Sequence, residues 1–133
     1  MKKHLPYFNI VCLVLILVSC KSAIKPGDLF GKWKYTKVEH PKADPPDSLS
    51  ASEVQAEAPY IQFSNNDLVI MWSGKVLSHG TYVIDGENIR YTEYLPEGGK
   101  RQFPFWISKF DGSNLVFETT GAEGSRVTAV KTP

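Results

Sequence analysis

The sequence is nearly free of cysteine. Its two thiols, Cys12 and Cys20, both fall within the first twenty of the 133 residues. The rest of the chain can therefore form no disulfide framework and no cysteine-ligated metal site. Histidine is scarce as well, because only His40 and His79 follow His4, and neither lies in a metal-binding motif. The sequence accordingly predicts neither a metal ion nor any other cofactor.

The chain also lacks an excess of charge of either sign. It has 15 basic and 14 acidic residues, for a net charge of +1, and loss of Lys2 and Lys3 would leave 13 basic residues against 14 acidic ones. Domains that bind nucleic acid need a basic patch, so we exclude nucleic acid as a partner. The serines occupy no nucleophile elbow, and no glycine-rich phosphate loop precedes a helix. The sequence therefore predicts no catalytic residues, and the protein is expected not to be an enzyme.

No hydrophobic run is long enough to span a membrane. The longest covers residues 10–18 (IVCLVLILV), whereas a transmembrane helix needs about 20 residues. This run follows Lys2 and Lys3 and is followed by Ser19 and Cys20. A charged start, a short apolar core and a small residue before the cleavage site are typical of a secretory signal.

Leu17-Val18-Ser19-Cys20 resembles a bacterial lipobox. The resemblance implies that residues 1–19 are a lipoprotein signal peptide and that Cys20 becomes the first residue, carrying acyl chains such as palmitate. Several acyl chains would anchor the protein stably, which makes the membrane its expected partner. Lys21, in place of the aspartate that some bacteria read as a retention signal, favours the outer membrane, facing the periplasm. An ordinary signal peptide with an incidental cysteine and an uncleaved anchor are the alternatives. Residues 20–28 are then a tether, broken by Pro26-Gly27.

The remaining chain, residues 29–133, reads as a single all-β domain. Short apolar segments alternate with turn signals such as Asp85-Gly86 and Asp111-Gly112. The pattern predicts eight strands, at residues 32–38, 60–64, 68–72, 76–84, 88–95, 102–110, 114–119 and 126–131. Short connections favour an up-and-down antiparallel barrel, which leaves no exposed edge; a two-sheet sandwich is the alternative.

Three positions within these strands carry specific expectations. Strict alternation in the first strand would place Lys37 on the same face as Trp33 and Tyr35. Gly80, inside a strand, predicts a bulge or bend. Pro104 lacks an amide proton, so its strand is expected to lie at an edge or to be bulged.

One connection is long. It runs from Glu39 to Pro59 (residues 39–59) and contains four prolines. Within it Ser50-Ala51-Ser52-Glu53 fits a capping box, which predicts one or two helical turns on an otherwise irregular loop. A loop of this length is either functional, for example a lid over the open end of the barrel, or a mobile segment in solvent.

Gly31-Lys32-Trp33 resembles the G-x-W opening of lipocalins. Together with the hairpin around Asp85-Gly86 and the segment from Trp106 to Phe117, it makes residues 29–130 similar to the small lipocalin-like (calycin-type) domains of bacterial lipoproteins. The resemblance implies that Trp33 closes one end of the barrel beneath a basic residue of the last strand. Antiparallel pairing of the first and last strands makes Lys131 that residue, and a cation over an indole stabilises by about 0.5–1 kcal/mol or more.

The aromatic residues of the strands suggest two functions. They either line a cavity for a small hydrophobic ligand or fill the interior of a small barrel. In the second case the protein is a protein-interaction or inhibitor module of the cell envelope, with an apolar patch at the strand rims built from Trp72 or Trp106. The candidate ligand-binding residues are Tyr35, Phe63, Tyr82, Tyr91, Glu93, Phe103 and Phe105.

Glu93 is the one acidic residue that alternation places on an apolar face. Inside the barrel its carboxylate could hold a polar group of the ligand. If the strand end instead projects from the barrel, the carboxylate is solvated, and this second interpretation is the one that the sequence favours.

Overall fold

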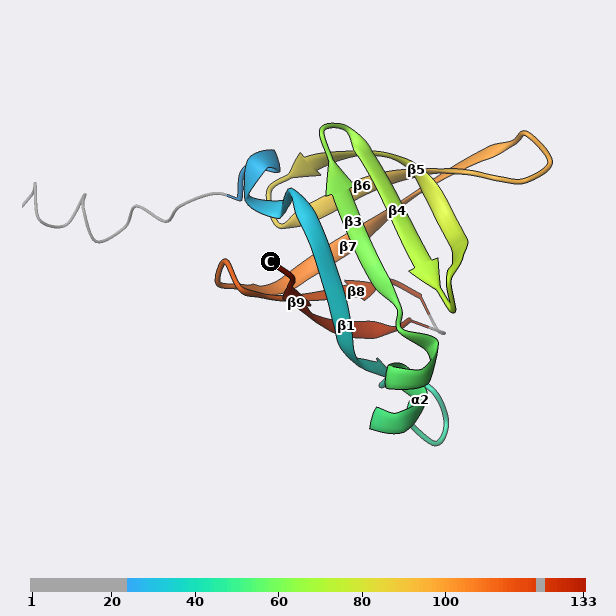
Figure 1. Cartoon of the computed structure of the whole chain (residues 1–133). Helices are drawn as coiled ribbons and strands as arrows, with labels where there is room; N and C mark the ends of the chain where they lie inside the picture. Colours follow the sequence, from blue (N-terminus) through green and yellow to red (C-terminus); the bar gives the residue numbers. More distant parts are fainter. Residues whose placement is uncertain (1–23, 122–123) are drawn as a thin grey trace, which may run out of the picture.

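A computed structural model describes residues 24–121 and 124–133 as one antiparallel β-barrel (Figure 1). The expected signal peptide and Cys20 lie outside the described residues. The end of the expected tether is a turn of 3-10 helix, η2 (Pro26–Leu29), and its last side chain, Leu29, is fully buried. None of the helices in this described part of the chain is long and apolar enough to cross a membrane.

Each of the eight predicted strands is present, with ends that differ from the prediction by at most two residues. They are β1 (Gly31–His40), β3 (Tyr60–Ser64), β4 (Asp67–Trp72), β5 (Lys75–Asp85), β6 (Asn88–Tyr94), β7 (Lys100–Phe110), β8 (Asn114–Thr119) and β9 (Arg126–Lys131). Each pairs antiparallel with the next, from β1 to β3 and onward to β9.

Pairing between the first and last strands closes the barrel. β1 and β9 run antiparallel from Trp33 opposite Lys131 to Glu39 opposite Arg126. A sandwich of two sheets would leave both strands at edges, so this pairing excludes the sandwich. At the far end of the seam, Arg126 donates from Nε and Nη2 to the two carboxylate oxygens of Glu39, each at 3.2 Å.

A bulge corrects the expectation for Lys37. Tyr35 lies opposite Ala129 and Lys37 opposite Thr128, so Thr36 is the extra residue. The side-chain alternation shifts by one at this point. Lys37 therefore faces solvent and Val38 enters the core in its place.

The long connection is more ordered than its sequence suggests. β1 extends to His40, and a two-residue strand that the sequence does not reveal, β2 (Asp47–Ser48), pairs back onto its end. The predicted capping box is confirmed: Ser50 caps helix α2 (Ala51–Glu57) by accepting from the amide of Glu53. Val54 anchors the helix in the core, and the amide of Ser73 donates to the carbonyl of Glu57.

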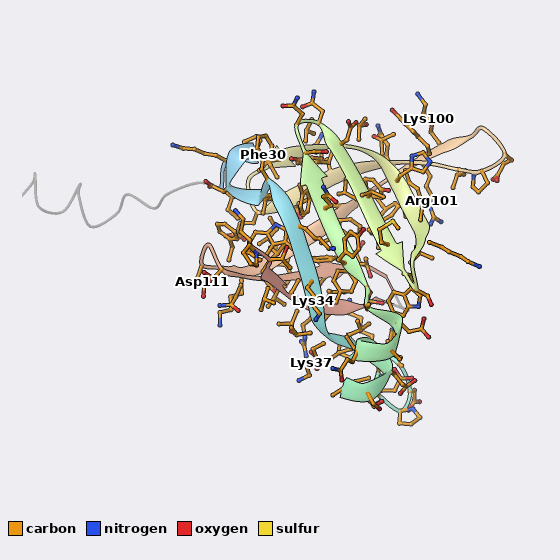
Figure 2. All side chains as sticks on the ribbon, viewed as in Figure 1. Phe30, Lys34, Lys37, Lys100, Arg101 and Asp111 are labelled. Atoms are coloured by element: carbon orange, nitrogen blue, oxygen red, sulfur yellow. The ribbon has the colours of Figure 1, made fainter. Side chains whose placement is uncertain are left out.

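The two ends of the barrel differ in the elements that lie there. At one end η2 meets the β5–β6 and β7–β8 turns, and we call this the closed end. At the other end lie α2, the β4–β5 turn and the β6–β7 loop (residues 95–99), and we call this the mouth (Figure 1). In Figure 2, Phe30 and Asp111 lie at the closed end, whereas Lys100 and Arg101 lie toward the mouth.

Gly80 marks a close approach of strands rather than the bulge itself. The extra residue of β5 is Leu77, three positions earlier, since Ile70 lies opposite Ser78 and Met71 opposite Val76.

Pro104 fits its prediction in part. It pairs with Arg90 of β6, but the ladder to β8 begins only at Phe105, so Pro104 lies where β7 is an edge on that side. No amide proton is needed there.

Replacing Gly80 with alanine is expected to destabilise the barrel by about 1–3 kcal/mol, the usual cost of overpacking. A Cβ atom at this position would lie 1.9 Å from the carbonyl oxygen of Thr92, which belongs to the backbone and cannot move alone. Urea unfolding measures the change. Gly99→Ala is the matched control, because its Cβ would meet nothing closer than 3.6 Å; equal stability of the two variants would contradict the close approach.

The closing seam is expected to weaken in acid. The hydrogen bond from Arg126 holds the pKa of Glu39 below its ordinary value. The lowered pKa stabilises the folded state above the carboxyl's ordinary titration range, and this stability is lost as the pH falls through the lowered folded-state value. Glu39→Gln should remove this part of the pH dependence at a cost below about 1 kcal/mol at neutral pH. Urea unfolding between pH 3 and pH 7 tests this; an unchanged acid slope in the variant would contradict it.

Candidate functional site

Trp33 seals the closed end. Its side chain is fully buried, and its Nε1 donates to the carbonyl of Leu29 at 2.9 Å, which ties η2 across the end of the barrel. Phe110 packs against the indole, with ring centroids 6.0 Å apart. Lys131 lies opposite Trp33 in the pairing of the first and last strands, and its Nζ lies 5.7 Å from the indole centroid.

Aromatic side chains fill the middle of the barrel. Phe105 contacts both Tyr91 and Phe117, at centroid separations of 5.5 and 5.3 Å, and Phe117 contacts Tyr35 at 6.0 Å. Across the interior Phe63 packs edge-on against Tyr82 at 5.1 Å. Such contacts leave little room for a ligand among these rings.

The candidate ligand-binding residues thus fall into two groups. Five aromatic residues are buried in the packed interior, with exposed fractions of 4 % or less, and are core residues: Tyr35, Phe63, Tyr82, Tyr91 and Phe105. Glu93 and Phe103 lie nearer the mouth, where Phe103 is half-buried.

The interpretation of Glu93 as a solvated strand end is wrong. Its exposed fraction is 8 %, and it is the centre of a hydrogen-bonded cluster at the mouth. One carboxylate oxygen accepts from Arg101 Nε at 2.6 Å and the other from Ser78 Oγ at 2.5 Å. Because the single O–H of Ser78 donates to Glu93, the hydroxyl of Tyr91, 2.6 Å from Ser78 Oγ, is the donor in that contact.

We call Ser78, Tyr91, Glu93 and Arg101 the mouth cluster. Its carboxylate charge is matched by the guanidinium, which meets the requirement that buried charges be paired. Burial raises the pKa of the Tyr91 hydroxyl, so the phenol stays protonated and continues to donate at neutral pH. Desolvation likewise raises the pKa of Tyr35, deeper in the barrel.

Two half-buried aromatic residues and an exposed cation lie toward the mouth. Trp72, at the end of β4, and Phe103 are both half-buried and pack against the core. Arg101 lies 5.2 Å from the centre of the Phe103 ring, and 63 % of its side chain is exposed. Within the described part of the chain only its Nε is bonded, so the Nη groups point to solvent. The rim beside Trp72 carries two exposed aliphatic residues, Val76 and Leu77.

Alternation contained a signal for the two cluster residues that sequence reasoning missed. Counting back in twos from Tyr82 along β5 reaches Ser78, and counting back from Phe103 along β7 reaches Arg101. The β6–β7 hairpin then sets Arg101 directly opposite Glu93. Alternation alone could not pair Arg101 with Glu93, because the five-residue loop between β6 and β7 does not fix the register of the hairpin.

Hollows lie along the sheet and at the closed end. A groove of about 670 Å³ runs over β5, β6 and β7; exposed residues such as Val83, Arg90 and Gln102 line it together with the predicted ligand-binding residues Tyr82, Tyr91 and Phe103. A second hollow of about 920 Å³ lies at the closed end, between η2 and the β7–β8 turn. Across residues 24–121 and 124–133, no group of three or more histidine, cysteine, aspartate or glutamate side chains is arranged to hold a metal ion.

Removing the hydroxyl of Tyr82 and that of Tyr91 is expected to have different effects on the free energy of unfolding. The buried hydroxyl of Tyr82 has no hydrogen-bond partner within the described structure, whereas that of Tyr91 bonds to Ser78. Tyr82→Phe should leave the free energy of unfolding unchanged or raise it by up to about 1 kcal/mol, and Tyr91→Phe should lower it by about 1 kcal/mol. Urea unfolding of the two variants checks this. Equal losses would contradict the assigned hydrogen bonds.

No protein-family profile matches the sequence, and no curated protein matches it either. Among solved structures, the chain is similar to a lipocalin-like protein from Bacteroides uniformis, with a TM-score of 0.56 and 20 % sequence identity over 80 % of this chain and 100 % of that one. Closure of eight antiparallel strands agrees with this similarity. The fold of this chain is a lipocalin-like β-barrel.

Proposed function

We propose that this protein is a lipid-anchored binding protein of the bacterial cell envelope that holds a small amphipathic anion at the mouth of its barrel. Cys20 carries the lipid, and the outer membrane, facing the periplasm, is its location. The lipobox-like sequence that ends at Cys20 supports the anchoring, and Lys21 after it supports the outer membrane. A lipocalin-like barrel is a fold suited to ligand binding, and this supports the general activity.

The mouth cluster is the observation that carries the binding site. The packed aromatic interior leaves little space for a ligand deep in the barrel, so binding takes place where the packing ends. There an apolar group can lie against Trp72 and Phe103, each buried methylene contributing about 0.8 kcal/mol. An anionic group can bond to the free Nη atoms of Arg101, whose position is fixed by Glu93. A ligand with both parts matches the mouth better than a purely hydrophobic one.

The fluorescent anion 1-anilinonaphthalene-8-sulfonate has both parts and serves as the probe. Titrated into the chain from Lys21 onward, it should bind, and Trp72→Ala should weaken binding about tenfold, equivalent to about 1.4 kcal/mol. Arg101→Gln should weaken it as well, because the sulfonate loses its cation.

Trp106→Ala is the matched control, since Trp106 lies on the outer face of β7 and is 43 % exposed. It should leave the affinity unchanged. Absence of binding, or equal effects of the two tryptophan variants, would overturn the proposed mouth site.

A second function is favoured by one observation. Val76 and Leu77 are 55 % and 62 % exposed at the rim of the mouth, next to Trp72. Apolar side chains exposed together are typical of protein-contact sites. A filled-barrel interaction or inhibitor module would bind its partner here, and Val76→Ser with Leu77→Ser would abolish that binding while leaving that of the sulfonate probe intact.

A further inference from the structure

The chain enters the barrel at its closed end. Ile24, the first described residue, lines the hollow at this end together with Gly27 and Phe110. η2 follows at once, held to the barrel by the buried Leu29 and by the hydrogen bond from Trp33. The point at which the chain leaves the domain toward Cys20 is thus fixed relative to the barrel axis (Figure 1).

The connection to Cys20 is short. Three residues lie between Cys20 and Ile24, which makes four residue steps. A chain spans at most about 3.3–3.6 Å per residue, so the reach is at most ~14 Å. The eleven residues of β5 run from Lys75 at the rim of the mouth to Asp85 at the closed end. At ~3.3 Å per residue and a tilt of ~40°, Val76 lies ~23 Å farther along the barrel axis than Asp85. This reach is shorter than the distance between the two ends of the barrel. With Cys20 held in the bilayer, the mouth therefore cannot face the membrane surface.

The closed end also carries aromatic residues suited to a membrane interface. Phe30, next to η2, is 39 % exposed, and Trp106 is 43 % exposed beside the β5–β6 turn. Trp106 Nε1 contacts a carboxylate oxygen of Glu87 at 3.4 Å, which places the indole at that turn. An aromatic ring exposed at the level of phospholipid head groups is favourable, because one part contacts the acyl boundary and another stays hydrated.

Charge at this end is balanced and does not set the orientation. Lysines and acidic residues both lie around the closed end, three of each among them: Lys25, Asp28, Glu87, Lys109, Asp111 and Lys131. The tether and the two aromatic residues are then the determinants.

We propose that the closed end of the barrel rests on the phospholipid surface, with Phe30 and Trp106 at the head groups, and that the mouth opens away from the membrane. This inference rests on the proposed lipid on Cys20. It deepens the proposed function, because the mouth cluster then meets molecules in the aqueous space and not lipids of its own bilayer.

Two lysines provide a matched pair of probe positions. Lys109 lies at the closed end, Lys75 lies at the mouth, and both are exposed. The full-length lipoprotein, purified from membranes, has no thiol after residue 20, so Lys109→Cys and Lys75→Cys can each be labelled with a nitroxide. The labelled proteins are placed in vesicles of phosphatidylethanolamine and phosphatidylglycerol that contain a nickel-chelating lipid. Relaxation of the nitroxide by the nickel reports its distance from the membrane surface.

We expect the label at position 109 to relax several-fold faster than the label at position 75. Equal relaxation, or faster relaxation at position 75, would overturn the orientation. Phe30→Ser with Trp106→Ser should reduce the difference, whereas Val76→Ser with Leu77→Ser, the control pair at the mouth, should not; the reverse pattern counts against the proposal.

Mass spectrometry of the same preparation separates the two proposals. If Cys20 carries no acyl chain, the anchoring and the orientation both fail. If it is acylated and the two labels relax equally, only the orientation fails, and binding of the sulfonate probe is unaffected by either result.

Discussion

Hydrogen bonding between β1 and β9 turns a meandering sheet into a closed barrel, and most other features depend on that closure. Once the ring of eight strands is complete, the interior has a fixed and small cross-section. Trp33 and Tyr35 enter it from β1 by simple alternation, and Val38 follows because the bulge at Thr36 shifts the alternation by one residue. The aromatic residues of the other strands then fill the remaining space, and Trp33 with η2 seals one end.

Because the interior is filled, the polar groups that could bind a ligand lie at an end of the barrel. The mouth is where packing stops, and there the chain places a carboxylate among aromatic rings, which requires a complete set of partners. Ser78, Tyr91 and Arg101 supply them, and the guanidinium still presents its Nη groups to solvent. The closed end has the opposite character, with a buried indole inside and exposed rings outside. The described chain begins at the closed end and the polar cluster lies at the mouth, so the two ends of the barrel differ in character.

Much of the fold was predictable because its signals are local. Alternation located the eight strands, and Ser50 and Glu53 marked the start of α2, since a capping box involves only neighbours in sequence. The errors arose where pairing overrides alternation. Lys37 faces solvent because of a bulge, β2 exists only because it pairs with β1, and Gly80 serves an approach of Thr92 from the next strand. None of these has a signature within a few residues.

The sequence by itself determined the all-β architecture, the up-and-down order of its eight strands and the absence of thiols after Cys20. These follow from residue types, their period and the order of strands. Only the tertiary structure decided that the barrel is filled and that Glu93 is paired rather than solvated. Burial and partnership depend on strand register and on how side chains from distant strands meet, and a single sequence records neither.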